Sequence, residues 1–533
     1  MDEYLTSGSV SVRRNFFAIS CVVVAEPLSS TVLLPFVYFM VQDFGYVEGE
    51  IGTRAGMITS AFFIAQMFSN PLWSILSNRI GRKPCLVLGL LGTAVSMIFF
   101  SLAPSLSWAI VFRSLCGVMN GNNPIARTVV GELSEVTGVG KAQAFSLFGF
   151  CLAGGWMVGP LIGGLLADPM RHWGFPGPLG VFEYHKWLFP CAFVASYNTI
   201  VAILACLFLD ETSKFSLRVR KTCAQTSAAS TFSQETTPVA PGSKRNSWNC
   251  SVQETSSLAS GSKRNSQNYS VEETTPLIPG SNRNSQIYSV QDSSETVTPK
   301  VNFRKVQGLA TLSAIFYFIH IIFFDELFPL FAASDISSGN GLSFLPQDIA
   351  KALVFAGPAM LSALVFFTML HGKFGSRTLF RATAIIFAMI YPLFSLLPSI
   401  RASTGPIALW ISLVFLIIIR YSGMVVGLAS IQILFNDAAR PSERAFLNGL
   451  AQSAGSFARA VGPTLGGSTW SWSLRNGLSA PLDYHAAFLL LSILGIGQYL
   501  STLGIPTDEV LEEERIRTIM VQDGQDGEGE ENV

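Results

Sequence analysis

The sequence predicts an all-α membrane protein whose twelve transmembrane helices form two six-helix bundles. The mean hydropathy of the 533-residue chain is +0.43. Only 13% of its residues are charged, whereas soluble domains average about 25%. Twelve apolar segments are long enough to cross a bilayer, which takes about 20 residues. Six of these segments precede a long polar segment and six follow it.

The apolar and polar segments divide the chain into four regions. The expected spans cover residues 16–40, 54–76, 84–103, 107–131, 143–167, 186–209, 307–332, 349–371, 378–399, 407–435, 446–470 and 485–505. Residues 1–212 are expected to form the N-terminal six-helix bundle and residues 304–506 the C-terminal one. Residues 213–303 form a linker between them, and residues 507–533 form an acidic tail.

Lys and Arg in the short loops set the expected orientation, because these residues favour the cytosolic side. An even number of spans puts both termini on one side. That side carries eleven basic residues: Arg13, Arg14, Arg79, Arg82, Lys83, Lys141, Lys373, Arg377, Arg381, Arg440 and Arg444. The opposite side carries six: Arg54, Arg171, Lys186, Lys351, Arg401 and Arg475. This bias predicts that both termini, the linker and the tail are cytosolic.

The linker has too few large apolar residues to fold, so we expect it to be disordered. It repeats at a 19-residue period, as "GSKRNSWNCSVQET" from 242, "GSKRNSQNYSVEET" from 261 and "GSNRNSQIYSVQDS" from 280. These repeats are either a tandem duplication without function or a regulatory segment. The regulatory alternative rests on the basic residues that precede Ser247 and Ser266, as in sites for basophilic kinases.

A second pattern in the linker concerns sorting. The stretch "EETTPLIPG", with Glu273, Leu277 and Ile278, resembles the acidic dileucine signal that directs membrane proteins to vacuoles, lysosomes or endosomes. Sorting adaptors and kinases are therefore candidate partners. The sequons at Asn249 and Asn268 are expected to stay unmodified, because the predicted topology puts them in the cytosol.

Glycine-rich stretches recur at matching places in the two halves. "GWMVGPLIGG" (155–164) lies in the fifth span and "RAVGPTLGG" (459–467) in the eleventh. Small residues at four-residue spacing let helices pack closely in lipid, and a proline is tolerated in a membrane helix. The residues concerned are Gly155, Gly159, Pro160, Gly163, Gly164, Arg459, Gly462 and Pro463. They form either a static packing seam or a seam between the halves that moves during transport.

The same order of motifs in both halves indicates a parallel internal repeat. "RSLCGVMNG" in the fourth span parallels "RYSGMVVG" in the tenth, and "NRIGRK" (78–83) parallels "GKFGSR" (372–377). The chain resembles a major facilitator superfamily transporter over all twelve spans. "WSILSNRIGRKP" (73–84) is similar to the signature between spans two and three. "GWMVGPLIGG" is similar to the span-five signature of drug/proton antiporters.

The resemblance extends to a narrower group and includes one departure. "EPLSSTVLLPFVYFM" (26–40) and "RPSERAFLNGLAQSAGSFARAVGPTLGGS" (440–468) resemble the fungal and plant zinc-induced-facilitator-like group. The resemblance implies that Asn78, Arg79, Gly81, Arg82 and Lys83 form a cytosolic gate motif. Family members usually carry Gly and Asp where this chain has Ser74 and Asn78. The latch that this Asp makes in the outward-facing state is therefore expected to be weaker here.

Ionisable residues inside the spans are candidates for function, because they are costly to place in a membrane. They are Glu26, Arg113, Arg127, His320, Asp325, Glu326, Arg420 and Arg459. Aligning Pro35 with Pro329 puts His320 opposite Glu26 in the repeat. A carboxyl group and an imidazole at mid-membrane are suitable proton carriers. The alternative for Glu26 is an ion pair, with Arg113 or Arg127, that holds helices together.

Three further residues have expected roles. Asp325 and Glu326 are expected toward the non-cytosolic end of span seven, where they bind a cationic substrate, form a gate, or lie at a solvated helix end. Arg113 matches the span-four arginine that the superfamily links to proton transfer. Because a buried arginine does not lose its proton, we expect Arg113 to hold a carboxylate ionised until a proton or substrate arrives.

The sequence carries no P-loop, GxSxG motif or metal-ligand cluster, and its eight cysteines include no CxxC. The net charge is zero, so there is no excess of basic residues that would indicate nucleic-acid binding. We therefore expect no enzyme, cofactor or metal. The expected function is proton-coupled antiport of a small organic solute, such as a secondary metabolite or xenobiotic, out of the cytosol. The expected location is the plasma membrane or a vacuolar or endosomal membrane.

Two alternatives stay open at this point. One is a uniporter or symporter of the same fold for a nutrient or, as the subgroup resemblance implies, a metal-chelating organic acid. The other is a non-transporting nutrient receptor that signals through the long linker. The lipid bilayer, a small-molecule substrate and protons are the partners that the main expectation requires.

Overall fold

The computed structural model describes residues 2–137, 141–174, 181–212, 303–335, 341–437, 444–507 and 510–511. The linker repeats, both sequons and the sorting signal at Glu273, Leu277 and Ile278 lie outside the described residues. The boundaries of the linker and of the tail therefore stay predictions.

The regular elements of the described ranges are all helices, which confirms the predicted fold class. The N-terminal half comprises α1 (Asp2–Thr31), α2 (Val37–Asp43), α3 (Glu48–Ile80), α4 (Arg82–Ser101), α5 (Leu106–Met119), α6 (Asn122–Thr137), α7 (Lys141–Leu165), α8 (Pro169–Trp173), α9 (Val181–Tyr184) and α10 (Leu188–Phe208). The C-terminal half comprises α12 (Phe303–Ala333), α13 (Pro346–Leu353), α14 (Ala356–Ser395), α15 (Leu397–Thr404), α16 (Pro406–Asp437), α17 (Arg444–Arg475) and α18 (His485–Ser501).

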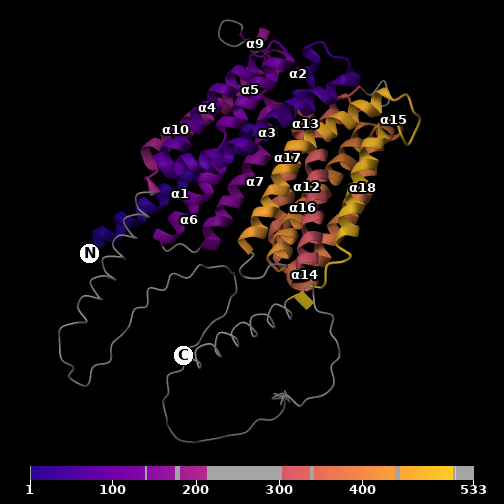
Figure 1. The fold of residues 1–533 in the computed structure, drawn as a ribbon. Coiled ribbons are helices and arrows are strands. Elements are labelled where there is room, and N and C mark those ends of the chain that lie inside the picture. The colour runs from indigo at the N-terminus through magenta and orange to yellow at the C-terminus, as the bar shows by residue number, and fades with distance from the viewer. Residues whose placement is uncertain are drawn as a thin grey trace, which may run out of the picture. The chain divides into compact units, whose positions relative to one another are not determined.

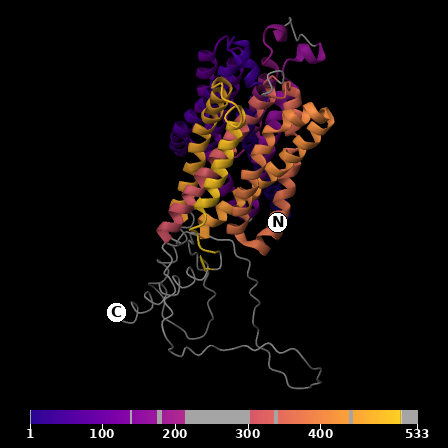
Figure 2. The ribbon, with the colours of Figure 1, turned by 90° about the vertical axis from the view of Figure 1, so that its right-hand side faces the viewer.

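The long helices of the two halves run side by side, with the N-terminal half in indigo to magenta and the C-terminal half in orange to yellow (Figures 1 and 2). Six helical stretches of the described chain are long and apolar enough to cross a membrane: Arg82–Ser101, Leu147–Leu165, Leu188–Phe208, Arg304–Ala333, Pro346–Ser395 and Pro406–Phe435. The other predicted spans coincide with helices that are shorter, interrupted or more polar.

The halves share a glycine turn at equivalent positions. Gly81 separates α3 from α4 with φ +106°, and Gly375 bends α14 with φ +74°. A residue with a side chain is strained at such positive φ values. Gly81 lies in "NRIGRK" and Gly375 in "GKFGSR", so the repeat seen in the sequence is a repeat of backbone geometry.

The fourth predicted span, 107–131, is built from two helices, because the chain breaks at Asn120 and Gly121 between α5 and α6. A Cβ at Gly121 would overlap the Trp73 indole, so only glycine fits beside that ring. The freed carbonyl groups have partners in α3. Trp73 Nε1 donates to the Val118 carbonyl (2.6 Å) and Gln66 Nε2 to the Asn120 carbonyl (3.0 Å). Broken helices are tolerated at membrane depth when neighbours satisfy the backbone in this way.

The glycine stripe of α7 packs inside its own half. A Cβ at Gly155 or Gly159 would meet Pro27 or Thr31 of α1, and one at Gly163 would meet Val32, which directly follows α1. A moving seam between the halves is therefore wrong for Gly155, Gly159 and Gly163, whereas Gly164 and Pro463 do lie between the halves. Pro160 lies within α7 between two of these contacts. Gly462 makes the equivalent contact in the C-terminal half, against Ile322 and Phe323 of α12.

The halves meet through three other pairs of helices, α3 with α17, α7 with α13 and α7 with α14. Gly467 and Pro463 of α17 lie against Gly52 and Gly56 of α3. Gly164 of α7 lies against Pro346 and Ala350 of α13, and Gly357 of α14 against Met157 of α7. We call the end of the helices where α3 begins the Glu48 end. The opposite end, where α10 finishes and α12 starts, is the terminal end. These contacts lie from the centre toward the Glu48 end.

Candidate functional site

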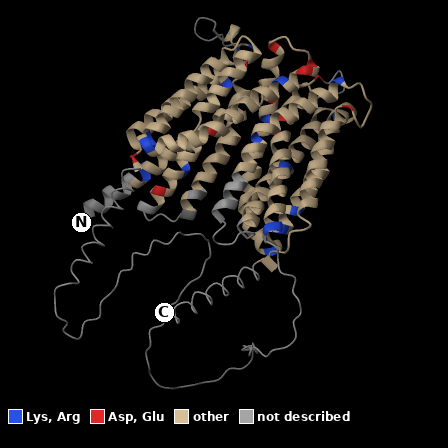
Figure 3. Cartoon of the chain, viewed as in Figure 1, with Lys and Arg blue, Asp and Glu red and all other residues tan. Residues whose placement is uncertain are grey.

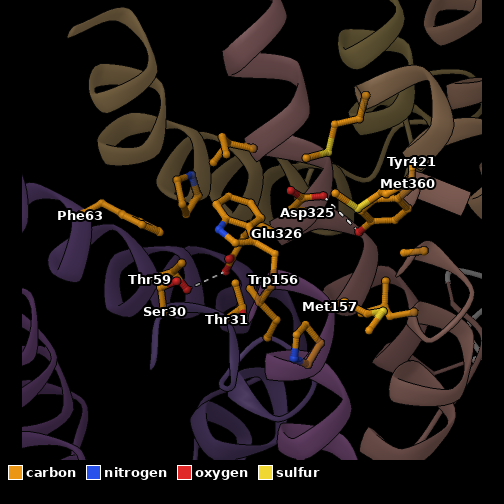
Figure 4. Close-up of a pocket in the computed structure, with 17 residues that line it drawn as sticks. Ser30, Thr31, Thr59, Phe63, Trp156, Met157, Asp325, Glu326, Met360 and Tyr421 are labelled. Carbon is orange, nitrogen blue, oxygen red and sulfur yellow. Dashed lines mark hydrogen bonds between the residues drawn. The ribbon is translucent and has the colours of Figure 1, made fainter. Parts of the chain in front are cut away.

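A cavity of about 60 Å³ lies between the two halves, with room for several water molecules. The N-terminal half lines it with Ser30, Thr31, Leu34, Thr59, Phe63, Trp156, Met157 and Pro160. The C-terminal half lines it with Ile322, Asp325, Glu326, Leu353, Ala356, Met360, Tyr421, Met424 and Pro463. Figure 4 shows that Asp325 and Glu326 approach the cavity from the same helix but turn toward different partners.

Asp325 belongs to a buried ion pair of the C-terminal half. Its Oδ1 lies 2.9 Å from Nη2 of Arg420 and 3.3 Å from the Tyr421 hydroxyl. Arg420 is fully buried, donates also to the Ile321 carbonyl at 2.8 Å, and lies 4.7 Å from the ring centres of Phe324 and Tyr421. The pair joins α12 to α16. The alternative of a solvated helix end is therefore wrong for Asp325.

Glu326 is buried as well, with 2% of its surface exposed, and it faces the other half of the molecule. Its Oε1 lies 3.4 Å from the Thr59 hydroxyl of α3. Its Oε2 has no hydrogen-bond partner among the described residues. Arg113 and Asp325 both act on the carboxyl group electrostatically, with opposite signs. The solvated-end alternative is wrong for Glu326 too, because α12 continues past it to Ala333 within the packed helices.

Arg113 makes its hydrogen bonds to backbone carbonyl groups, and its role in holding a carboxylate ionised stays a prediction. Its Nη1 donates to the Ser29 carbonyl (3.0 Å) and its Nη2 to the Ser30 carbonyl (2.7 Å). These carbonyls are in the last turn of α1, where intrahelical donors run out. The guanidinium group also lies 4.5 Å from the ring centre of Phe62. Arg113 therefore caps α1 inside the N-terminal half, beside the cavity.

Glu26 lies about one turn closer to the terminal end, outside the set of residues that line the cavity. Its Oε1 accepts a hydrogen bond from Gln66 Nε2 at 3.0 Å and lies 3.9 Å from Nη1 of Arg459. The ion-pair partner is thus Arg459 of α17, from the other half, and not Arg113 or Arg127. Arg127 stacks on Phe148 at 5.2 Å and acts on Glu26 from a longer distance.

His320 is fully buried inside the C-terminal half and does not line the cavity. One ring nitrogen lies 2.8 Å from the Tyr391 hydroxyl and the other 2.8 Å from Oε1 of Gln498. The imidazole thus links α12 to α14 and α18. Although the repeat puts His320 opposite Glu26, the two side chains have different environments.

The gate motif at the terminal end of α3 is part of a polar network. Arg82 Nη1 donates to Asn78 Oδ1 at 2.5 Å, and Nη2 pairs with Glu132 at 3.1 Å. The backbone N–H groups of Arg82 and Lys83 donate to the Glu211 carboxylate, which lies against Gly81. Arg79 is exposed. Glu132 and Glu211 were not among the predicted site residues, although both are acidic residues at the ends of predicted spans.

Serine and threonine residues between α3 and α17 were also missed. The Thr464 hydroxyl lies 2.9 Å from the Ser60 hydroxyl, and the Thr464 N–H donates to the same oxygen at 3.1 Å. Nearer the Glu48 end, the Thr53 N–H donates to Ser471 Oγ at 2.8 Å. Their pattern is ordinary for membrane helices, so no sequence signal marked them as contacts between the halves.

Comparison with known proteins agrees with this architecture. The model of the Major Facilitator Superfamily matches residues 19–463. The multidrug transporter mfsB of Aspergillus fumigatus is 29% identical, over 87% of this chain and 80% of its own length. Zinc Induced Facilitator 1 of Arabidopsis thaliana is 24% identical, over 92% of this chain and 91% of its own length.

A further relative and a solved structure complete the comparison. The major facilitator-type transporter psiT2 of Psilocybe cyanescens is 25% identical, over 89% of this chain and 87% of its own length. The crystal structure of a D-xylose–proton symporter has the same fold. It superimposes with a TM-score of 0.63 at 12% identity, over 93% of this chain and 98% of that chain.

Proposed function

The chain belongs to the Major Facilitator Superfamily of membrane transporters, and from this premise we propose that it is a proton-coupled antiporter. In this proposal, it exports a small organic solute from the cytosol by alternating access. Efflux is supported by the names of relatives, which include the multidrug transporter mfsB and the efflux pump azaK of Aspergillus niger.

The proposal of proton coupling rests on the position and surroundings of Glu326. It is buried, it lines the central cavity, and one carboxyl oxygen has no hydrogen-bond partner among the described residues. An ionised carboxylate in such a place is costly unless a cation faces it. The group is therefore stable in two conditions, with a proton bound or with a cationic group of the solute beside it. Exchange between these conditions couples the two fluxes.

Glu26 and His320 have other roles in this proposal. Glu26 faces Arg459 across the halves, so it acts as a contact between them on the terminal side of the cavity. His320 holds three helices of the C-terminal half together through Tyr391 and Gln498. Arg113 supports Glu326 electrostatically while it caps α1.

Alternating access is supported by where the halves touch. The hydrogen bonds of Ser60, Thr464, Thr53 and Ser471 lie from the centre toward the Glu48 end. Gln347 adds a further bond across the halves, to the Ala167 carbonyl at 2.9 Å. Closure on this side of the cavity fits a state in which the solute enters from the terminal end. The parallel repeat of the halves suits a rocking motion about the central site.

The terminal end is cytosolic in this proposal. The loops expected there carry eleven Lys and Arg residues against six at the other end, and Figure 3 shows basic residues at the lower helix ends of both halves. Export then runs across the plasma membrane or into a vacuole or endosome. We infer that the linker, with its kinase-like and sorting-like motifs, selects the membrane or regulates the activity.

The test uses the purified full chain in liposomes that trap a pH-sensitive dye. An imposed pH gradient is combined with a fractionated extract of solutes, and mass spectrometry follows uptake. We expect solute accumulation that requires the gradient, together with dye-reported proton exit. Both are expected to fall about a hundredfold in Glu326→Gln, which keeps the shape of the side chain but does not titrate.

Glu26→Gln is the matched control, since it makes the same change outside the cavity. It is expected to retain proton exit, although its rate changes because a contact between the halves is altered. Accumulation that ignores the gradient would show a facilitator. Loss of proton exit in Glu26→Gln alone would move the coupling role to Glu26. If a known transporter works in the assay and this chain moves no solute, the proposal is wrong.

A further inference from the structure

The two acidic residues of the cavity are adjacent in the chain but differ in their charge balance. Asp325 is matched by the Arg420 guanidinium at 2.9 Å. Arg420 in turn has 0% of its side chain exposed and is enclosed by Phe324 and Tyr421. Buried ion pairs of this kind stay ionised together, because removing one partner leaves an uncompensated charge. Asp325 therefore contributes no net charge to the cavity.

Glu326 contributes the remaining charge. Thr59, on α3, is a neutral partner at 3.4 Å. Arg113 is bound to two α1 carbonyl groups and lies over the Phe62 ring. The charged groups that act on Glu326 are thus Arg113 from α5 and Asp325 from α12, and Asp325 is balanced by Arg420 of α16. Arg113 makes its hydrogen bonds to backbone, so among the described lining residues Glu326 is the carboxylate without a directly bound cation.

The walls around Glu326 are aromatic and sulfur-containing. Phe63 and Trp156 come from the N-terminal half and Tyr421 from the C-terminal half (Figure 4). Met157, Met360 and Met424 also line the cavity. Aromatic faces attract cations, and methionine side chains adapt to apolar groups of different shape. This lining suits a flat or bulky apolar body with one cationic group.

We propose that the central site takes a solute with a single positive charge on an aromatic or apolar body. In this proposal, the Asp325–Arg420 pair determines how many positive charges the solute carries, because it leaves Glu326 as the carboxylate that the solute must match. The inference rests on the proposed antiport. In the exchange, the Glu326 carboxyl group loses its proton to the compartment that the cavity faces, and the carboxylate then pairs with the cation of the solute. One proton leaves for each cation that binds, so the cycle moves no net charge.

A series of naphthalene compounds of similar size tests the charge requirement. The probes are 2-(1-naphthyl)ethylamine, neutral 1-naphthaleneacetamide and anionic 1-naphthaleneacetate, given to the full chain in liposomes under a pH gradient. We expect the amine to be taken up at least about tenfold faster than the other two, because it alone pairs with Glu326. Uptake of the amine is expected to be unaffected by a membrane potential set with valinomycin and potassium.

Variants of Asp325 and Arg420 are expected to change how many positive charges the accepted solute carries. Asp325→Asn leaves Arg420 to balance Glu326, so uptake of the amine is expected to fall about tenfold and the neutral amide to become the better probe. Arg420→Gln leaves two carboxylates and favours a naphthalene diamine with two charges. The double variant restores one carboxylate and is expected to recover the amine. Because the double variant removes both buried charges, it also tests whether a failure of Arg420→Gln is a failure to fold.

The outcomes separate this inference from the proposed function. Proton-driven uptake of the acetamide or acetate as fast as that of the amine would overturn the charge requirement and leave antiport intact. Uptake that varies with membrane potential would overturn the one-for-one exchange. The same ranking of probes in Asp325→Asn as in the unmodified chain would remove the pair from specificity. An absence of gradient-driven uptake for every probe and every extract fraction would instead contradict the proposed function.

Discussion

Some buried polar side chains of this transporter have all their hydrogen-bond partners, whereas others lack one. The first kind stabilises the fold, and the second kind is available for the proposed transport. His320 makes two hydrogen bonds of 2.8 Å inside the C-terminal half, and both partners are buried. Glu326 makes one long hydrogen bond across the halves and keeps one oxygen unmatched among the described residues. A buried side chain whose hydrogen bonds are all made is not stabilised further by a ligand or a proton. A buried side chain that lacks a partner is stabilised when it binds a ligand or a proton.

His320→Leu tests this distinction at the residue scale. The substitution is expected to destabilise the protein by about 1–3 kcal/mol, because the Tyr391 hydroxyl and Gln498 lose a buried partner. The pH dependence of solute uptake is expected to stay unchanged. Thermal unfolding in detergent and proton exit from liposomes measure the two effects. Tyr391→Phe removes one of the two bonds and is expected to cost less. A stable His320→Leu protein that no longer exchanges protons would identify His320 as a carrier.

The sequence located most of the charged residues of the site but not their pairing. Intramembrane charge is rare enough to select Glu26, Arg113, Asp325, Glu326 and Arg420 from hydropathy alone. Which arginine meets which carboxylate depends on how the helices rotate and shift against one another. Glu26 and Arg459 are 433 positions apart, and a local pattern holds no information on such a distance. The same reason explains why the capping role of Arg113 was missed.

At the scale of the helices, the apolar runs and the internal repeat predicted where the spans lie. They did not predict where a helix breaks within a span. The break at Asn120 was missed because hydropathy continues through it while hydrogen bonds from α3 replace those within the helix. The glycine stripe of α7 was recognised, but spacing says only that one face is small. It does not say which helix covers that face. The structure puts α1 there and uses α17 and α3 for contact between the halves.

Two glycine substitutions separate packing within a half from packing between halves. A methyl group at Gly163 would overlap the carbonyl of Val32, which directly follows α1, and one at Gly467 would overlap the Gly52 carbonyl of α3. Gly163→Ala is expected to lower stability by about 1–3 kcal/mol without changing which side of the protein is open. Gly467→Ala is expected to favour the state in which α3 and α17 separate.

Thiol labelling measures the second effect. Ser60→Cys is placed in a chain whose eight natural cysteines are replaced, and an impermeant maleimide is added at the Glu48 side. We expect faster labelling when Gly467→Ala is also present, and no change with Gly163→Ala. Equal labelling in both would mean that the α3–α17 contact does not control access.

For the whole molecule, the proposed alternating access requires that the seam between the halves be weak enough to open in each transport cycle. It contains the Ser60–Thr464 and Thr53–Ser471 bonds and the Gln347 bond to the Ala167 carbonyl. Net contributions of about 0.5–1.5 kcal/mol for each hydrogen bond give a total of a few kcal/mol. A solute or proton that binds one state more tightly can shift an equilibrium of that size.

A disulfide across this seam is expected to stop transport. The Ser60 and Thr464 hydroxyls are 2.9 Å apart, so cysteines at both positions are close enough to be oxidised with small adjustments. Oxidation of Ser60→Cys/Thr464→Cys, in the background without other cysteines, should abolish gradient-driven uptake because the halves no longer separate at the Glu48 end. Dithiothreitol should restore it.

The control for this experiment lies within one half. The hydroxyls of Ser313 in α12 and Ser501 in α18 are 2.7 Å apart, and both helices belong to the C-terminal half. Oxidation of Ser313→Cys/Ser501→Cys should therefore leave most of the uptake, because each half is expected to move as a unit. Full transport by the oxidised Ser60→Cys/Thr464→Cys protein would contradict alternating access through this seam. Equal arrest in both proteins would mean that motion within a half, rather than between the halves, carries the solute across.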